Sequence, residues 1–422
     1  MRIALDSPLK KRALIAWFVL VATYLVVVTV QFASDWLASR FHLGSLRAAV
    51  KLDPGNADYH DRLGRYYDLV AQDPPSAIEQ YQIAVRLNPH DAHYWLDLAG
   101  TYQVRDDIEG QTHALARAVQ VDPTSPKVAW EAANLYVTRG WFQEALREFH
   151  VVMDGDPYLP ETAMRTCWRI SPNVDLLLKD VIPARIDSYL AFLSLLMSKE
   201  ETTGTIKVWD ALIALHQPVG IPSVFNYIKY LLLHKSPEEA SLVWREAASL
   251  LDLNAYLPSS NNLIVNGDFH LDVLNGGFDW QHQKRPSVSL ALDTSEFHAG
   301  HRSLSISFDG PGVVDAGIYQ LIAVQPNTTY QFSAYYKNGE IEGAGGLHFS
   351  LEDLYTSHLY FLSDDLKFGS VWKNVWSEFK TDSDTKVLVL RIQRLPAGSP
   401  FRGKLWIDDF HLVEKQAGKG SS

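Results

Sequence analysis

Two pairs of adjacent acidic residues, Glu352-Asp353 and Asp408-Asp409, are the side chains best suited to acid–base chemistry. Hydrolysis of a glycosidic bond needs two carboxylates about 5 to 9.5 Å apart across a cleft. Neighbouring residues on a strand project to opposite faces, so neither pair would share one cleft. The sequence also contains no H-E-x-x-H, paired C-x-x-C, P-loop or G-x-S-x-G motif. We therefore expect neither an enzyme nor a catalytic metal.

The composition limits the classes of partner. The 422-residue chain has a formal net charge of −11, and its Lys and Arg residues form no basic stripe. Binding to nucleic acid depends on Lys and Arg side chains that neutralise phosphates, so no nucleic-acid partner is expected. The single cysteine, Cys167, cannot form an internal disulfide, which leaves both a cytosolic and a non-cytosolic location open.

The C-terminal third alternates between apolar and polar residues with a period of two, for example from Tyr330 to Ala334 and from Leu388 to Ile392. Glycines and Asn, Asp or Pro turns separate these runs. The pattern predicts an antiparallel all-β sandwich over residues 263–415, with one buried face in each sheet. Four polar or aromatic side chains are expected to face outward from its strands, namely Tyr335, His348, Arg391 and Gln393.

The preceding part of the chain is expected to be helical and repetitive. Prolines at positions 54, 89, 123 and 157 are separated by 35, 34 and 34 residues. Small residues at Gly64, Ala99 and Ala133 let paired helices approach closely, and each proline ends a helix because it cannot continue the hydrogen-bond ladder. The pattern predicts an all-α solenoid over residues 36–157. An ordinary helical bundle with chance spacing is the alternative.

This spacing and its marker residues resemble the tetratricopeptide repeat family. The resemblance implies helix-turn-helix units that bind other proteins rather than catalyse a reaction. Beyond Pro157 the repeat becomes irregular, but Trp209 and Trp244 lie 35 residues apart, so degenerate repeats are expected over residues 158–256. A polar, turn-rich segment, residues 257–262, is expected to link them to the sandwich.

An apolar segment without charges, residues 13–34, is long enough to cross a membrane as a helix. The basic cluster before it places residues 1–12 in the cytoplasm and the bulk of the chain outside, in the periplasm of a Gram-negative cell. A cleaved signal peptide is the main alternative, but its apolar region is usually about 7–15 residues long, and Gln31-Phe32-Ala33 is a poor cleavage match. A buried globular helix is the third alternative. We expect an uncleaved, single-pass signal anchor.

Several motifs of the predicted sandwich resemble carbohydrate-binding modules of the family 4/9 type, which are galactose-binding-like jelly rolls. They are Asn262 to Phe269 with Gly277 to Trp280, His298 to Leu304, Tyr319 to Lys337, and Gly403 to Phe410. The resemblance covers about residues 262–415. It implies a sugar chain lying across one sheet face, where aromatic rings stack and polar side chains bind hydroxyls. It also implies that the four outward residues form this face, against the alternative of a plain solvated surface.

The resemblance further implies a structural calcium that ties the first strand of the sandwich to the last. Asp268, Asp408 and Asp409 match its oxygen ligands in position. His270 stands where the family has a glutamate, however, and a histidine nitrogen is a poor ligand for calcium. This calcium is the single cofactor that the resemblance suggests.

Two hypotheses about function follow. In the first, the chain is a membrane-anchored, extracytoplasmic scaffold whose solenoid recruits protein partners while the sandwich contacts glycan or protein. A role in bacterial envelope or exopolysaccharide assembly is then expected by analogy. In the second, sugar recognition by the jelly roll is the main function. Residues 416–422 are expected to be a disordered tail.

Overall fold

The computed structural model describes residues 7–155, 160–311, 313–367, 369–397 and 400–415. The predictions made for Pro157, for residues 1–6 and for the 416–422 tail lie outside these ranges. The chain forms two compact units, Met1–Leu195 and Leu196–Ser422. Their boundary falls inside helix α11 (Ile186–Ser198) and not at the predicted 257–262 linker. The last helices therefore belong to the same unit as the sandwich.

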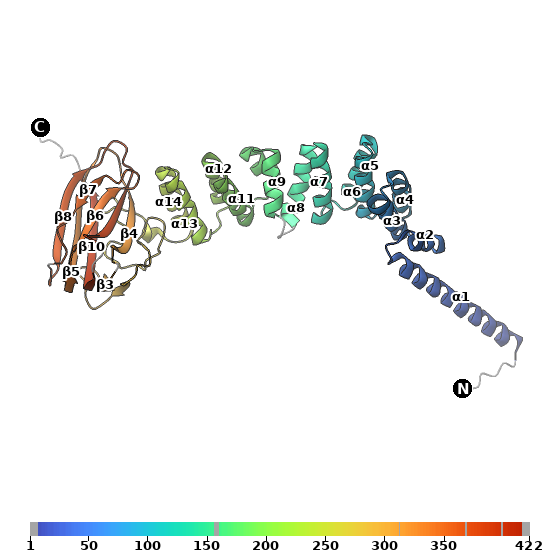
Figure 1. Cartoon of the computed structure of the whole chain (residues 1–422), viewed down its shortest axis with the longest axis horizontal. Coiled ribbons are helices and arrows are strands. Elements are labelled where there is room, and N and C mark those ends of the chain that lie inside the picture. The colour runs from blue at the N-terminus through green and yellow to red at the C-terminus, as the bar shows by residue number, and fades with distance from the viewer. Residues whose placement is uncertain (1–6, 156–159, 312, 368, 398–399, 416–422) are drawn as a thin grey trace. The chain divides into compact units, whose positions relative to one another are not determined.

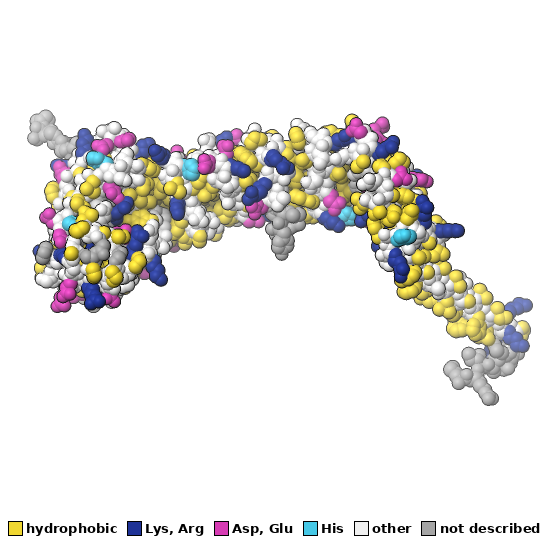
Figure 2. Space-filling view, viewed as in Figure 1, with side chains coloured by type: hydrophobic (Ala, Val, Ile, Leu, Met, Phe, Trp, Pro, Cys, Tyr) yellow, Lys and Arg dark blue, Asp and Glu magenta, His cyan; other side chains and the backbone are white. Residues whose placement is uncertain are grey.

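Helix α1 (Pro8–Ala38) contains the predicted span, residues 13–34. Ser7 caps its first turn, because the backbone N–H of Lys10 donates to Ser7 Oγ at 3.3 Å. The most apolar stretch has a mean hydropathy of 2.5 and is not buried by other parts of the chain. Figure 2 shows hydrophobic side chains along the visible surface of this helix. Within the described ranges α1 is the single helix that is long and apolar enough to cross a membrane, a test that a signal sequence would also pass.

Helical hairpins follow the predicted repeat, and α3–α4, α5–α6 and α7–α8 come in succession (Figure 1). Each hairpin begins with a capped turn, in which Asn56, Asp91 and Ser125 accept backbone N–H bonds at 3.0, 3.0 and 3.4 Å. The predicted helical solenoid is therefore confirmed. Its helices are α2 (Leu43–Leu52), α3 (Ala57–Tyr66), a π-helical turn (Tyr67–Ala71), α4 (Pro74–Leu87), α5 (Ala92–Val104), α6 (Ile108–Val121), α7 (Pro126–Arg139), α8 (Phe142–Gly155), α9 (Pro160–Ile170), α10 (Val174–Asp180) and α11.

Small residues bring the paired helices together, as expected. A Cβ atom at Gly64 would lie 2.7 Å from the ring of Tyr81, which is itself fully buried. Ala99 and Ala133 have no exposed surface. Any larger side chain at these positions would have to push the helices apart.

The second unit continues with α12 (Thr202–Ile213), α13 (Ile221–Leu233) and α14 (Pro237–Leu250). Trp209 of α12 and Trp244 of α14 are both buried, at 2% exposure. The ring of Trp209 packs against Tyr227 with a centroid separation of 5.4 Å. The 35-residue spacing of these tryptophans thus marks corresponding helices of two irregular repeats.

Two five-stranded antiparallel sheets form the predicted sandwich (Figure 1). Their strand orders are β1-β4-β9-β6-β7, here called the front sheet, and β2-β3-β10-β5-β8, the back sheet. Phe332, Phe349 and Phe410 meet in the core between them. The strands are β1 (Gln281–His282), β2 (Val288–Asp293), β3 (Ser303–Gly310), β4 (Asp315–Ala323), β5 (Thr329–Gly343), β6 (Gly346–Asp353), β7 (Leu359–Leu362), β8 (Lys373–Lys380), β9 (Val387–Leu395) and β10 (Phe401–Glu414).

A short connection joins α14 to the sandwich. It contains a 3-10 turn (Asn254–Tyr256) and a bridge between Ser259 and Asn262. Trp244 Nε1 donates to the carbonyl oxygen of Tyr256 at 3.0 Å, and the Tyr256 hydroxyl donates to the carbonyl oxygen of Asp272 at 2.8 Å. Tyr256, directly before the segment predicted as a linker, thus connects α14 to the loop that precedes β1.

Candidate functional site

The structure brings three of the four predicted face residues together. Arg391 and Gln393 lie on β9, and His348 lies opposite Gln393 on the neighbouring β6, all in the front sheet. Tyr335 lies on β5, in the back sheet. The predicted face of four residues is therefore corrected to three. Alternation indicates which side of a strand a residue occupies, but not to which of two sheets the strand belongs.

Hydrogen bonds order the outer face of the front sheet. Arg391 Nη2 lies 2.5 Å from Glu352 Oε1, and Gln393 Nε2 donates to Ser350 Oγ at 2.8 Å. Nδ1 of His348 lies 2.8 Å from a backbone carbonyl oxygen. Nε of Arg391 is buried and has no hydrogen-bond partner among the described atoms. An unmet buried donor of this kind costs about 1–3 kcal/mol, and because it is buried it is not exposed to a ligand on the face.

Tyr319 of β4 lies directly opposite Arg391 on the same face, although it was not among the predicted residues. Its hydroxyl donates to Gln281 Oε1 at 2.9 Å. Tyr319 and Arg391 line a hollow of about 230 Å³, together with the ion pair between Arg285 and Asp315. An aromatic ring beside hydrogen-bonding side chains is suited to sugar, because the ring stacks while the polar groups bind hydroxyls. No clear signal in the sequence marked Tyr319, because the neighbouring Gln320 is polar and yet buried.

Tyr335 belongs to an aromatic cluster on the outer face of the back sheet. Its ring stacks on His298, with centroids 3.6 Å apart and planes inclined by 13°. Nδ1 of His298 lies 3.1 Å from Asp409 Oδ2, and the Trp372 ring lies 5.8 Å away. Because His298 covers one face of Tyr335, that face is not free to stack on a sugar.

The predicted calcium ligands are engaged in other contacts. Asp408 is buried, which raises the pKa of its carboxyl group, and its Oδ2 accepts two backbone N–H bonds at 2.7 and 2.9 Å. Asp268 Oδ1 lies 2.5 Å from His270 Nδ1, and Asp409 contacts His298. In the described ranges, no group of three or more His, Cys, Asp or Glu side chains could hold a metal ion. In this arrangement the three carboxylates do not form a calcium site, and calcium binding stays a prediction.

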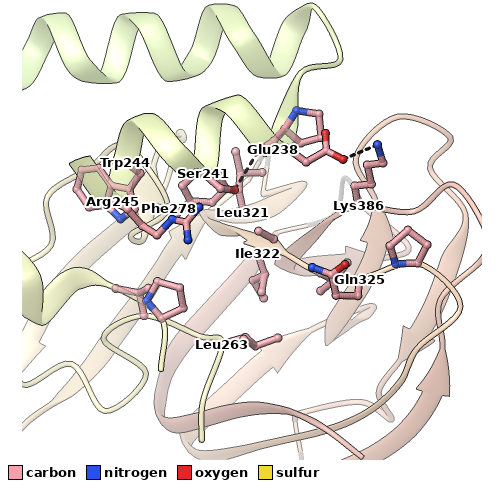
Figure 3. A pocket seen from close by; sticks show the side chains of 16 residues that line it. Glu238, Ser241, Trp244, Arg245, Leu263, Phe278, Leu321, Ile322, Gln325 and Lys386 are labelled. Atoms are coloured by element: carbon pink, nitrogen blue, oxygen red, sulfur yellow. Dashed lines mark hydrogen bonds and ion pairs between the residues drawn. The ribbon is translucent and has the colours of Figure 1, made fainter. Parts of the chain in front are cut away.

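A second hollow, of about 310 Å³, lies between α14 and the sandwich (Figure 3). Trp244 of α14 and Leu321 of β4 line it from the two elements. Lys386 and Glu238 form an ion pair at 2.5 Å beside it, and the hydrogen bond from Lys386 lowers the pKa of Glu238. Helix α14 thus contacts the end of the front sheet through both apolar and charged groups.

The first unit contains an acidic groove of about 610 Å³, here called the solenoid groove. Six carboxylates and three Lys or Arg side chains line it. Arg65 lies 3.0 Å from Asp61 and 2.7 Å from Asp97. Asp61 is 2% exposed and its Oδ1 has no partner among the described atoms; burial and the nearby Asp97 raise its pKa to about 8. The groove therefore favours a cationic group, which would relieve this unfavourable crowding of carboxylates.

Residues 261–398 match the CBM_4_9 family, described as "Carbohydrate binding domain". This match confirms the predicted resemblance of the sandwich to carbohydrate-binding modules. No curated protein matches the chain. Among solved structures, a CBM4 structure is 15% identical to this chain. The alignment covers 36% of this chain and 99% of the CBM4 chain, with a TM-score of 0.29. PilF of Pseudomonas aeruginosa is 17% identical, with coverages of 53% and 94% and a TM-score of 0.27. A MamA structure is 17% identical, with coverages of 44% and 90% and a TM-score of 0.26.

Proposed function

We propose that this chain is a membrane-anchored, extracytoplasmic scaffold whose sandwich binds glycan and whose helical repeats bind a partner protein. Helix α1 is the anchor, with the residues before it in the cytoplasm. Such a layout suits assembly of a bacterial envelope or exopolysaccharide. The observation that carries the proposal is the outer face of the front sheet, where Tyr319 and Arg391 lie side by side within the region that matches the carbohydrate-binding family.

Tyr319→Ala is expected to weaken glycan binding by about tenfold or more. The change removes a stacking ring, worth about 0.5–1.5 kcal/mol, and a hydroxyl that helps to order the face. Calorimetric titration of the full-length chain in detergent with oligosaccharides selected on a glycan array measures this. The matched control is Tyr335→Ala on the back sheet, which should keep its affinity within about twofold. Equal losses in both variants would place the site elsewhere, and no binding to any glycan would overturn the glycan part of the proposal.

We also propose that the sandwich recognises sugar without cleaving it. Glu352 faces outward but is paired with Arg391. Asp353 is buried and accepts backbone N–H bonds from Tyr355 and Thr356 at 2.8 and 2.6 Å. As predicted, Glu352 and Asp353 project to opposite faces of their strand. The two carboxylates therefore do not share a cleft in which they could act as acid and base, and this supports the proposal. Release of reducing sugar by the purified chain would contradict it.

The acidic solenoid groove supports a protein partner that presents a Lys- or Arg-rich segment. The double variant Asp97→Asn with Glu131→Gln is expected to lose most of the partner captured by the wild-type chain, because it removes two of the lining carboxylates. The measurement is affinity capture from envelope extracts with quantitative mass spectrometry at low and high salt. Glu109→Gln with Glu144→Gln, an equal charge change at exposed acids of α6 and α8, is the control. Equal capture by both double variants would rule out the groove.

A further inference from the structure

The hollow beside Tyr319 continues into a larger cleft whose second wall is helix α13. This cleft encloses about 790 Å³ and shares Tyr319, Leu321 and Leu354 with the hollow on the front sheet. From α13 it is lined by Phe225, Asn226 and Lys229, among others. The candidate sugar face is therefore bounded on one side by a helix that lies outside the matched family region.

The helical wall is fixed to the sandwich by close packing. A Cβ atom at Gly276 would lie 2.1 Å from the ring of Phe225, and one at Gly277 would lie 3.1 Å from Trp244. Gly277 also has a φ of +62°, which favours glycine. The loop and the helices contact each other so closely that no side chain fits between them. A ligand in the cleft would thus meet a wall already in place, with little ordering cost.

Tyr355 lines the cleft, but its hydroxyl oxygen is not exposed there. The Tyr355 oxygen is buried and has no hydrogen-bond partner among the described atoms. Burial raises the pKa of Tyr355 to about 12, so the hydroxyl stays protonated at neutral pH and can both donate and accept. Because this oxygen is buried, a ligand in the cleft meets the ring of Tyr355 and not its hydroxyl.

The cleft offers few charged groups to an acidic sugar. Of its described lining residues, Lys229 alone is charged. Arg391 and Arg285 in the adjoining hollow are paired with Glu352 and Asp315. A uronic acid carboxylate would therefore find no pair of free guanidinium groups to bind it.

We propose that α13 forms part of the glycan site, so that an uncharged oligosaccharide stacked on Tyr319 extends into the cleft, packs on the Tyr355 ring and hydrogen-bonds with Asn226. This inference rests on the proposed glycan function. The last helices and the sandwich then form one binding site. The sandwich alone would contain only part of that site.

Asn226→Ala is the sharpest test. In the full-length chain it is expected to weaken binding of β-linked hexasaccharides of glucose, xylose or galactose by roughly 2- to 12-fold, the effect of one neutral hydrogen bond. Thermal stability should stay the same, because Asn226 is exposed. The matched control is Asn374→Ala, the same change at an exposed position of β8 in the back sheet, which should keep the affinity within about twofold.

The outcomes separate this inference from the function on which it rests. If Tyr319→Ala abolishes binding while Asn226→Ala leaves it unchanged, the glycan site stands and the helical wall is excluded from it. If the wild-type chain binds none of the sugars, both fall together. Preference for a hexamer of galacturonic acid over the uncharged sugars would overturn the assignment of ligand class.

Discussion

Replacing Trp280 with alanine is expected to lower the free energy of unfolding of the sandwich by about 3–5 kcal/mol. Its indole ring is 1% exposed and stacks on Phe269 with a centroid separation of 5.2 Å. It also meets Phe410 edge-on at 5.1 Å, and its Nε1 donates to the carbonyl oxygen of Asn266 at 3.0 Å. The substitution therefore leaves a large cavity and an unmet carbonyl, in the place where the segment before β1 packs on the last strand.

Hydrogen exchange of amides in β3 and β10 measures this effect, because it reports on the sandwich separately from the helical repeats. Trp376→Ala is the control: the ring lies on β8 and is 59% exposed, so the change in unfolding free energy should stay within about 0.5 kcal/mol. Trp280→Phe should lie between the two. If Trp280→Ala and Trp376→Ala had the same small effect, Trp280 would not be part of the core.

The two periodicities in the sequence predicted the elements of the fold but not which strands share a sheet. The 34-residue spacing of the prolines and the burial of Ala99 and Ala133 both follow from one local requirement, close packing within a helical hairpin. Alternation likewise placed Tyr335 and Arg391 on outward sides of their strands. Assigning them to opposite sheets needs the pairing of β5 with β10 and of β9 with β4, which is a long-range property.

The cleft beside α13 could not be predicted from the sequence for a related reason. In the sequence, Gly276 looks like an ordinary loop residue. Its packing role is seen only in the structure, where Phe225, about fifty residues earlier, lies against it. Similarly, Tyr355 follows a strand with no local pattern that marks its hydroxyl as buried and unpartnered. Both features arise because the last helices and the sandwich pack in one unit, whereas the sequence predicted a polar, turn-rich linker between them.

Placing aspartate at both Leu20 and Val27 is expected to shift the chain from the membrane fraction to the soluble fraction. Both side chains are exposed on α1, at 69% and 48%, so neither has a protein contact to lose. Each aspartate near the centre of a membrane helix costs about 2.5–3.5 kcal/mol on the biological insertion scale. Two of them cancel most of the apolar gain of residues 13–34. The measurement is fractionation followed by carbonate extraction and immunoblotting.

The control is Leu20→Ala with Val27→Ala, which shortens the same side chains without adding charge and should leave the chain in the membrane fraction. Intact-mass analysis of the membrane-bound protein distinguishes an anchor from a signal sequence, because an anchor retains residues 13–34 whereas a cleaved signal loses them. Protease added outside the inner membrane should then digest the repeats and the sandwich, since Lys10, Lys11 and Arg12 favour the cytoplasmic side. A mature chain that begins beyond residue 34, or full protection from the protease, would exclude the anchored, outward-facing arrangement.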